Sequence, residues 1–279
     1  MNIGIVGLGL IGGSIGLRLQ TLNHNVFGVV NNKSNQEKAI DRKLANYVTT
    51  DLNVLKKCSL IFLALPIRDL INPSKELIEN LPKDSIITDV ASIKGPIIKT
   101  WENLHPLFIG SHPMAGTEYQ GVNAGTIDLL KSAKWIITTT PKTANNSIQV
   151  LSKLINSMQC EAIFTTPENH DKATSLISHL PIFLASSLIH AVDSENDQMV
   201  NTLAKKIAST GFSDTSRVGG GNPELGSDLA KYNYENILSG IKELKSNLED
   251  FEKIILERDW KTIHNKLEQS KDIRSNFIN

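Results

Sequence analysis

The sequence has few cysteines, few aromatic side chains and no excess of charge of either sign. Its two cysteines, Cys58 and Cys160, lie far apart without the spacing of a zinc or redox motif. We interpret both as buried small hydrophobic residues. Lysine plus arginine and aspartate plus glutamate number 29 each, and no basic run alternates with aromatic residues. A nucleic-acid partner is therefore not expected.

Long apolar runs are missing as well. No stretch approaches the roughly 20 apolar residues that span a bilayer. The chain begins directly on a strand pattern, without a charged leader and cleavage site. These absences predict a soluble, cytoplasmic protein with no membrane partner. The 279 residues, 40% of them hydrophobic, can bury a sizeable core and favour two domains.

The hydrophobic pattern changes near residue 166. Before it, β-branched runs alternate with helical stretches, which predicts a mostly parallel sheet buried on both faces. After it, helical spacing replaces the strand signal. We predict an α/β fold with a Rossmann-type dinucleotide-binding domain over 1–166 and an all-helical substrate and dimerisation domain over 167–279. The expected strands lie at 3–6, 26–30, 60–64, 86–90, 107–109, 135–137 and 162–164, and the expected helices at 168–192, 197–210 and 231–277, with a loop at 211–223.

The last helical stretch carries an apolar seam. Its residues recur at alternating steps of four and three, which is typical of a helix that packs against another helix. A helical half this small has little core of its own, so we favour a homodimer contact over packing within the chain. The seam comprises Ile237, Ile241, Leu244, Leu248, Phe251 and Ile255.

A glycine-rich loop follows the first strand. Gly7, Gly9 and Gly12 have the spacing that permits a tight turn and brings a pyrophosphate close to the amides at a helix N-terminus. The loop has a strand before it and a helix after it, so it predicts dinucleotide binding. Glycines that serve only close helix packing do not account for all three. The expected cofactor-binding residues here are Gly7, Gly9, Leu10, Ile11 and Gly12, with Leu65 and Pro66 after the strand at 60–64.

The end of the second strand indicates which dinucleotide binds. An acidic residue about 20 residues beyond the glycines normally holds the ribose 2′-hydroxyl of NAD. This chain has Asn31, Asn32, Lys33 and Ser34 there, and no carboxylate before Glu37. These side chains would not repel a 2′-phosphate and could bind it, so NADP is predicted. An ordinary polar turn that contacts neither ribose is the alternative.

Three segments carry candidate chemistry. His112 follows the run at 107–109, and an imidazole at a strand end can exchange a proton at neutral pH, although a turn cap would also explain it. Ser92 follows the strand at 86–90, at the carboxyl edge where open α/β sheets bind ligands. His179 lies on the first helix of the second half beside Pro181, which should free the Ile177 carbonyl and bend that helix.

Together these segments resemble the prephenate and arogenate dehydrogenases of tyrosine biosynthesis over essentially the whole chain. The short length and the neutral cofactor turn make it most like the NADP-using arogenate dehydrogenases of cyanobacteria. It departs at Ile182, where many relatives have another histidine. The motifs are Gly7-x-Gly9-x-x-Gly12, Asp89-Val-Ala-Ser92-x-Lys94, Gly110-Ser-His112-Pro-Met-Ala-Gly116-Thr-Glu118, His170-Asp171 with Ser178-His179-Leu-Pro181, and Asp214-Thr-Ser-Arg217.

The resemblance implies roles for residues that match the motifs. His112 would accept a hydrogen bond from the ring hydroxyl of the substrate, and Ser92 would support it. His179 would lie in the substrate pocket, and Arg217 would hold the ring carboxylate, a role suited to its planar fork. Thr117 and Glu118, after the glycine turn, are candidates for sensing the substrate side chain.

The reaction implied is NADP-dependent oxidative decarboxylation of arogenate to tyrosine, with prephenate as the alternative substrate. Two other hypotheses for the function compete with this one. β-Hydroxyacid dehydrogenases and imine reductases also join a dinucleotide domain to a helical dimerising half, but they leave the His112 segment unexplained. A redox-sensing regulator would bind NADP without turnover and leave Ser92, His112 and Arg217 idle. Formation of NADPH only with substrate distinguishes the three.

Overall fold

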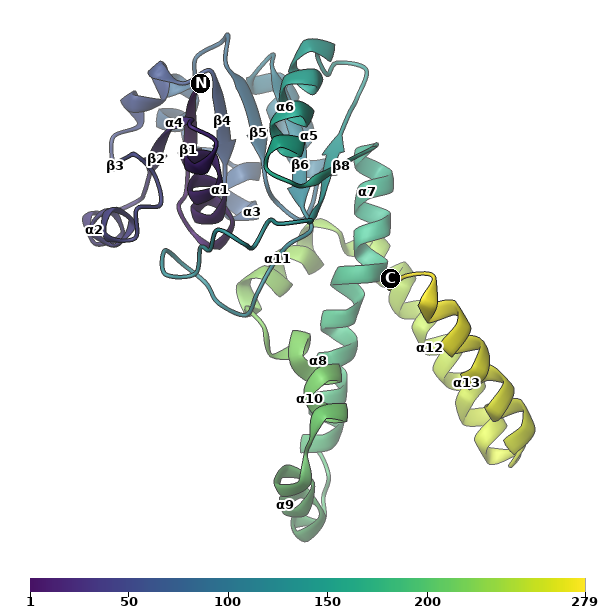
Figure 1. Ribbon diagram of the computed structural model, residues 1–279. Coiled ribbons are helices and arrows are strands. Elements are labelled where there is room, and N and C mark those ends of the chain that lie inside the picture. The colour runs from purple at the N-terminus through teal and green to yellow at the C-terminus, as the bar shows by residue number, and fades with distance from the viewer. Residues whose placement is uncertain (279) are drawn as a thin grey trace. The chain divides into compact units, whose positions relative to one another are not determined.

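The computed structural model describes residues 1–278 (Figure 1). It divides into two compact units, Met1–Asn233 and the helical segment from Tyr234 onward. The first unit contains the whole sheet and fourteen helices or helical turns, some between the strands and the others after the last strand. The sequence expectation of a mostly parallel sheet followed by helices is confirmed.

An eight-stranded sheet forms the centre of the first unit, in the order β3-β2-β1-β4-β5-β6-β7-β8. All neighbours pair in parallel except β6 and β7, which are antiparallel. The order reverses between β1 and β4, the place where doubly wound sheets bind ligands at their carboxyl edge. The strands are β1 Asn2–Val6, β2 Asn25–Val29, β3 Tyr47–Thr49, β4 Leu60–Leu63, β5 Ile86–Asp89, β6 Phe108–Pro113, β7 Lys134–Thr138 and β8 Glu161–Thr165.

Helices between the strands cover the sheet (Figure 1). The central strands β4 and β5 are buried along their whole length, which explains their continuous apolar sequence. All seven expected strands are present. The eighth, β3, has three residues at the sheet edge, too short for an apolar pattern to reveal it. The helical elements between strands are α1 Leu10–Thr21, α2 Lys33–Asp41, η1 Leu52–Lys57, α3 Ile67–Ile71, α4 Lys75–Asn80, α5 Gly95–Leu104 and α6 Asn145–Ser157.

The glycine loop between β1 and α1 depends on the missing side chains. Gly7 has φ +94°, a conformation that favours glycine, and a Cβ there would lie 2.3 Å from the Ala64 carbonyl oxygen. A Cβ on Gly12 would lie 1.9 Å from the Gly7 carbonyl oxygen. By contrast, no atom lies within 4 Å of the Cβ position of Gly9. The first and third glycines therefore serve the fold, whereas the second faces open space.

The helices after the sheet begin with a nearly continuous run. α7 Pro167–Thr174, the π-helical turn η2 Ser175–His179 and α8 Leu180–Asp193 follow one another without a break. The widened turn ends one residue before Leu180 and two before Pro181, which cannot donate an amide hydrogen bond. It is the local distortion that Pro181 predicts beside His179.

The expected loop at 211–223 is wrong. The structure has α10 Thr210–Ser216 and the 3₁₀ turn η3 Arg217–Gly220, followed by α11 Pro223–Tyr232. A Cβ on Gly219 would lie 2.5 Å from the Ser186 amide nitrogen of α8, whereas one on Gly220 would meet no atom within 4 Å. The glycines that suggested a loop thus include one that lets η3 pack closely on α8.

The run from Pro167 to Asp193 is 27 residues long and apolar enough to cross a membrane by length and composition alone. The expectation that no stretch reaches this length is therefore wrong. The run is also interrupted by the π turn and carries the buried polar residues His170 and Asp171. Its exposed apolar side chains, which include Leu176 and Ile177, are equally suited to contact with another protein chain.

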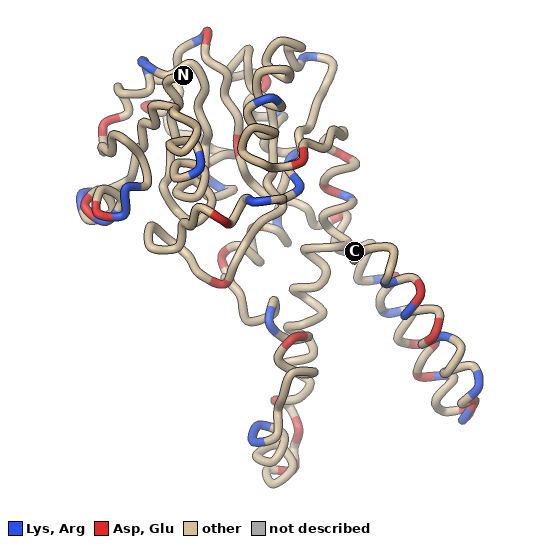
Figure 2. The backbone as a smooth tube through the Cα atoms, in the orientation of Figure 1, with Lys and Arg blue, Asp and Glu red and all other residues tan. Residues whose placement is uncertain are grey.

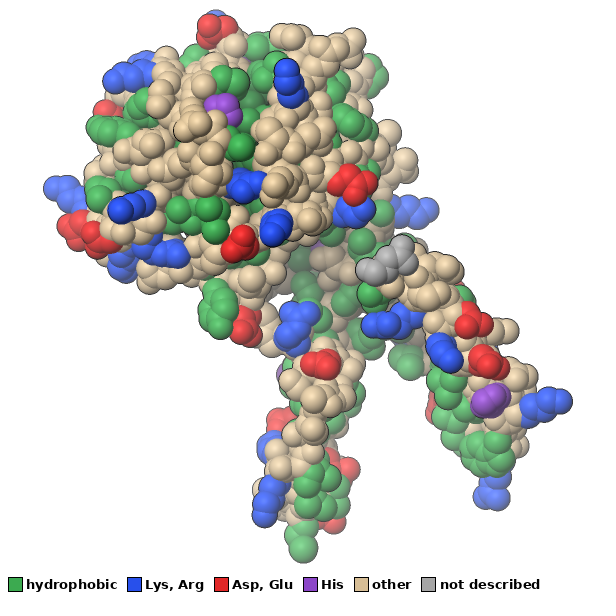
Figure 3. Space-filling view, viewed as in Figure 1, with side chains coloured by type: hydrophobic (Ala, Val, Ile, Leu, Met, Phe, Trp, Pro, Cys, Tyr) green, Lys and Arg blue, Asp and Glu red, His purple; other side chains and the backbone are tan. Residues whose placement is uncertain are grey.

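Further apolar side chains are exposed on α9 Gln198–Ile207. They lie at helical spacing, and Figure 3 shows hydrophobic side chains gathered at the far end of this helix. The face comprises Met199, Val200, Leu203 and Ile207. An unpaired apolar face on an otherwise polar helix is typical of a protein interface.

The second unit is a helical hairpin. α12 Tyr234–Leu256 and α13 Trp260–Ser275 are joined by a tight turn in which Arg258 has φ +56°. This break lies inside the single helical stretch expected at 231–277. Figure 2 shows basic and acidic residues interspersed along both helices. α12 lies beside α13, and Leu248 and Ile255 of its apolar seam are about half exposed, which leaves these side chains available to another chain.

Alanine at Gly12 and alanine at Gly9 should affect different properties, the first stability and the second dinucleotide binding. Gly12→Ala forces a methyl group against the Gly7 carbonyl and should cost about 1–3 kcal/mol, lowering the unfolding midpoint by roughly 2–4 °C per kcal/mol. Gly9→Ala should leave the midpoint unchanged and weaken dinucleotide binding, because its methyl group enters the space a pyrophosphate needs. Thermal denaturation and calorimetric titration measure the two effects. Unchanged dinucleotide affinity in Gly9→Ala would contradict this account.

Candidate active site

The candidate site lies where β5 and β6 separate. Pairing between these strands ends at Thr88 and Ile109, but β6 continues to Pro113 and pairs with β7 instead. The Asp89 side chain fills the gap. Its carboxylate accepts the Ser111 amide at 3.1 Å and the Ala91 amide at 3.0 Å. The two strand ends are therefore joined by a side chain instead of a backbone ladder.

A buried lysine completes this junction. The Lys94 ammonium donates to the Asp89 carboxylate and, at 2.7 Å, to the Ser111 carbonyl oxygen. Both charged side chains are fully buried. Burial lowers the pKa of Lys94 and raises that of Asp89, and the contact between the two opposes both shifts. Removing one partner from such a pair costs about 3–5 kcal/mol, so the pair can persist only as a unit.

Ser111 anchors the same junction through its hydroxyl. Oγ donates to the Asp89 carbonyl oxygen at 2.7 Å and accepts from the Trp135 indole at 3.0 Å and from the Thr88 hydroxyl at 3.0 Å. These bonds hold β5, β6 and β7 together one residue before His112. The backbone that presents His112 is consequently fixed from three strands.

His112 continues into a buried polar chain. Its Nδ1 lies 3.0 Å from Nε2 of His170, and Nδ1 of His170 lies 2.8 Å from Oδ1 of Asp171. The Asp171 carboxylate also accepts the amides of Lys94 at 2.7 Å and Gly95 at 2.8 Å, at the start of α5. Helix α7 is thereby attached to the sheet beneath His112. Within residues 1–278, Nε2 of His112 makes no hydrogen bond.

His179 lies beside this chain. Asn233 donates its amide to the Asp171 carbonyl oxygen at 2.8 Å, and the same nitrogen lies 3.2 Å from Nδ1 of His179. The other ring nitrogen of His179, Nε2, is buried without a hydrogen-bond partner among the described residues. A buried unpaired ring nitrogen is costly unless a ligand pairs with it.

All three imidazoles are neutral at neutral pH. Burial lowers the pKa of His112 well below 6.5, and His170, Lys94 and His179 lower it further. Burial also lowers the pKa of His170, which Asp171 opposes. The pKa of His179 falls to about 4, chiefly through burial, with Asp171 and the Ser92 main chain opposing the shift. His112 is therefore a hydrogen-bond acceptor or proton acceptor, not a cation, at working pH.

The residues predicted to bind the nucleotide at the glycine loop lie at the same edge of the sheet. Gly9 precedes α1, whose N-terminus has no side-chain cap, so its first amides can bind an anion in the open space over Gly9. Leu65 lies beside Gly7, and Pro66 begins α3. Leu10 and Ile11 are the first residues of α1 and half-buried. These residues fit a dinucleotide.

The turn after β2 presents donors. Asn32 caps α2 by accepting the Asn35 amide at 2.8 Å. The side-chain oxygen of Asn31 accepts from the side-chain amides of Asn32 and Asn35. Lys33 and Ser34, which follow, are exposed. With the side-chain oxygens of Asn31 and Asn32 engaged, the turn offers amide, hydroxyl and ammonium donors and no carboxylate.

Three predicted substrate residues lie apart from these contacts. Arg217 begins η3 and is exposed, and Thr117 and Glu118 are exposed in the segment after β6. Among residues 1–278, no hydrogen bond or ion pair joins any of them to His112. Gln120, just after them, accepts from Asn222 at 3.0 Å, which brings this segment to the start of α11.

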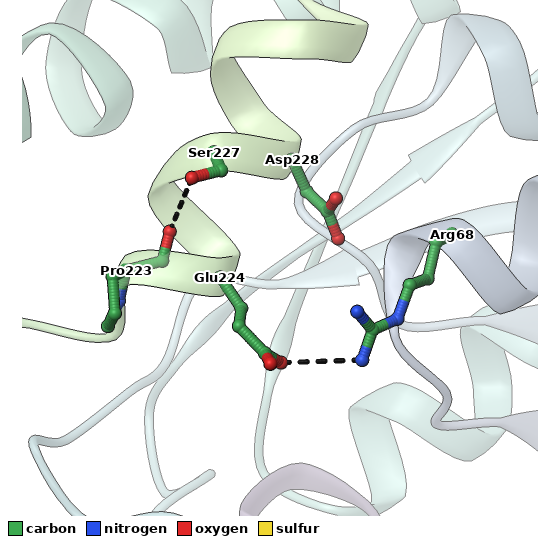
Figure 4. Close-up of a pocket in the computed structure, with 5 residues that line it drawn as sticks. All are labelled: Arg68, Pro223, Glu224, Ser227 and Asp228. Carbon is green, nitrogen blue, oxygen red and sulfur yellow. Dashed lines mark hydrogen bonds and ion pairs between the residues drawn. The ribbon is translucent and has the colours of Figure 1, made fainter.

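A shallow surface pocket lies between α3 and α11. Figure 4 shows Arg68 of α3 reaching toward Glu224 of α11, with 3.3 Å between the guanidinium and the carboxylate. Pro223, Ser227 and Asp228 line the rest of it. Both charged side chains are more than half exposed, so the pair contributes about 0–1 kcal/mol. It connects the helices after the sheet to the segment that follows Pro66.

Sequence reasoning missed several residues that build the site. His170, Asp171, Asp89 and Lys94 were recognised in motifs but given no role, and Ser111 and Asn233 were not singled out. A charged residue within an apolar strand, such as Asp89, signals a buried partner. Its partner five residues later was available in the sequence; the contact of His170 with His112 was not.

Comparison with known proteins identifies two family domains in the chain. Residues 15–164 match the family model "Prephenate dehydrogenase, nucleotide-binding domain", and residues 166–269 match "Prephenate dehydrogenase, dimerization domain". The prephenate dehydrogenase of Bacillus subtilis is 27% identical over 97% of this chain and 74% of its own length. The cyclohexadienyl dehydrogenase of Zymomonas mobilis is 27% identical over 98% of this chain and 94% of its own.

Two solved structures are similar over nearly the full length. Synechocystis arogenate dehydrogenase is 37% identical, covers 100% of both chains and has a TM-score of 0.87. The prephenate dehydrogenase of A. aeolicus, in complex with hydroxyphenyl propionate and NAD+, is 26% identical, covers 99% and 98% of the two chains and has a TM-score of 0.91. Taken with the paired domain matches, these likenesses show that the chain belongs to the prephenate and arogenate dehydrogenase family, nicotinamide-nucleotide-dependent oxidoreductases of tyrosine biosynthesis.

Proposed function

We propose that this chain catalyses the NADP-dependent oxidative decarboxylation of L-arogenate to L-tyrosine in the cytoplasm, as a homodimer. Residues 1–166 would bind the nucleotide, and residues 167–279 would supply substrate contacts and the dimer interface. One observation carries the proposal. A buried neutral histidine, His112, leaves Nε2 unpaired at the sheet edge that carries the glycine loop.

The residues support a reaction in which His112 accepts a hydrogen bond from the ring hydroxyl. A bound nicotinamide nucleotide supplies the hydride acceptor. The hydride leaves the ring carbon that bears the hydroxyl. The bond to the ring carboxylate then breaks, carbon dioxide departs, and the electron pair completes the aromatic ring of the phenol. Because aromatisation drives the step, the protein mainly orients the ring and polarises one hydroxyl.

The other candidate residues divide the remaining tasks. Ser92, which precedes α5, would support His112 and contact the nucleotide, and Arg217 would hold the departing carboxylate. His179 would bind the substrate: because the Asn233 amide donates toward Nδ1, its free Nε2 carries the proton and can donate to a ligand.

The preference for NADP rests on the turn after β2. Its donors, with Lys33 at the start of α2, suit a 2′-phosphate, whereas a carboxylate that would hold a 2′-hydroxyl and repel phosphate is missing before Glu37. The A. aeolicus relative was solved with NAD+. In this chain, the donors of the turn after β2 favour NADP over NAD.

The preference for arogenate rests on two supports. The chain is 37% identical to Synechocystis arogenate dehydrogenase over its full length. In addition, Glu118 is exposed in the segment after β6, the strand that carries His112, and its carboxylate would attract the ammonium of arogenate and offer nothing to the keto group of prephenate. Prephenate remains the alternative substrate.

Steady-state rates with both substrates and both nucleotides test this proposal. We expect the highest kcat/KM for arogenate with NADP. Asn31→Asp should raise KM for NADP and lower KM for NAD, since it places a carboxylate where the 2′-phosphate would lie. Asn156→Asp, at an exposed position of α6 outside the site, is the matched control. A higher kcat/KM for NAD in the unaltered chain would overturn the cofactor assignment, and one for prephenate would overturn the substrate.

Replacing His112 by Asn tests the acceptor. Asparagine keeps a polar side chain of similar reach but cannot take a proton, so kcat should fall by about 10²–10⁴-fold with KM nearly unchanged. Because the pKa of His112 is well below 6.5, the acid limb of the unaltered enzyme should also lie below pH 6.5. Normal turnover by His112→Asn would remove His112 from the mechanism.

The position of Arg217 should depend on Gly219. Arg217→Ala should raise KM for the substrate far more than it lowers kcat, because it removes a carboxylate contact. Gly219→Ala should show the same pattern, since its methyl group displaces η3 from α8. Gly220→Ala has open space at this position and serves as the control. Equal KM values for the two glycine variants would argue against a role for η3.

A further inference from the structure

We propose that His170 and Asp171 form a positioning relay that fixes the tautomer of His112, so that its Nε2 faces the substrate as an acceptor. The inference rests on the proposed function, in which His112 accepts the hydrogen bond of the ring hydroxyl. It adds two residues that do not touch the substrate and act only through His112.

The relay begins at the Asp171 carboxylate. Oδ1 accepts the Lys94 amide at 2.7 Å and Oδ2 accepts the Gly95 amide at 2.8 Å, both at the N-terminus of α5. The two amides donate to both carboxylate oxygens and hold the group in one orientation at a helix N-terminus, which favours negative charge. The carboxylate can therefore only accept from His170.

The proton positions follow in order. Nδ1 of His170, 2.8 Å from Oδ1 of Asp171, must carry a proton. His170 is neutral, so its Nε2 is unprotonated and must accept from Nδ1 of His112 at 3.0 Å. His112 is neutral too, so its single proton lies on Nδ1. Its Nε2 is left as a free acceptor, the form that a ring hydroxyl requires.

The relay also limits the cost of charge on His112. The charged groups that face it are Lys94 and Asp89 from the sheet edge, His170 and Asp171 from α7, and His179 from η2. Lys94, with a positive charge, opposes protonation of His112. As a proton is drawn toward Nε2, the bond from Nδ1 to His170 strengthens, and the Asp171 carboxylate stabilises the charge through His170 without itself taking a proton.

Asp171→Leu should release the order of the protons. With no carboxylate at Nδ1 of His170, the His170 proton is no longer held there and can occupy Nε2, which then donates to Nδ1 of His112 and moves the His112 proton to Nε2. The acceptor is blocked in that form. Nitrogen-15 spectra of histidine-labelled protein report which ring nitrogen carries the proton, with or without turnover. We expect only Nδ1–H of His112 in the unaltered chain and a share of Nε2–H in the variant.

Kinetics of a matched pair at His170 test the same relay. His170→Gln fills the ring's space and keeps an oxygen that can accept from Nδ1 of His112, whereas His170→Leu fills it without an acceptor. We expect kcat to fall by about 10²–10⁴-fold in His170→Leu and in Asp171→Leu, with KM within a few-fold. His170→Gln should retain most of the lost rate. Unfolding midpoints and NADP affinity show whether each variant is folded.

The outcomes separate the relay from the proposed function. Nδ1–H alone on His112 in both the unaltered chain and Asp171→Leu, or equal kcat losses in His170→Gln and His170→Leu, would overturn the relay while the enzyme remained active. If the unaltered chain oxidised neither substrate, the proposed function would fail, and the spectra alone would then decide whether the relay sets the tautomer.

Discussion

The buried pair of Asp89 and Lys94 is the interaction on which the candidate site depends. Its carboxylate replaces the backbone ladder where β5 and β6 part, and its ammonium holds the Ser111 carbonyl one residue before His112. A charge pair of this kind contributes little net stability compared with apolar packing, yet losing either partner is costly. We interpret it as a device that fixes geometry: it opens the sheet edge and keeps the opening rigid.

Burial at this junction has a second consequence, which is electrostatic. The lysine beneath His112 and the surrounding apolar packing both disfavour positive charge, so three neighbouring imidazoles stay neutral. Neutral histidines have one proton each, and their hydrogen bonds then determine where each proton lies. The low dielectric that makes an unpaired group costly also makes this arrangement specific. In the proposed tautomers, His112 on β6 would present an acceptor and His179 on η2 a donor.

A feature of the fold or of the site could be predicted from the sequence when the residues that make it are close together in the chain. The glycine loop, the parallel sheet and the change to helices near residue 166 follow from local spacing, because strand and helix periods differ. The lack of a carboxylate in the turn at 31–34 was also visible in the sequence, since the residues of the turn are consecutive. Local patterns predicted a loop in place of η3, because the close contact of Gly219 with α8 leaves no sign in the neighbouring sequence. They also gave His170 and Asp171 no role, because their partners lie 58 and 77 residues away in sequence.

The central claim is that Nε2 of His112 accepts the hydrogen bond of the substrate's ring hydroxyl. The most direct test is a crystal structure of this chain with NADP and L-tyrosine, whose phenol oxygen derives from that hydroxyl. We expect the phenol oxygen within about 2.6–3.2 Å of Nε2 of His112, with the ammonium group of the bound tyrosine directed toward Glu118. A phenol oxygen bound instead to His179 or Arg217, with Nε2 of His112 unoccupied, would contradict it.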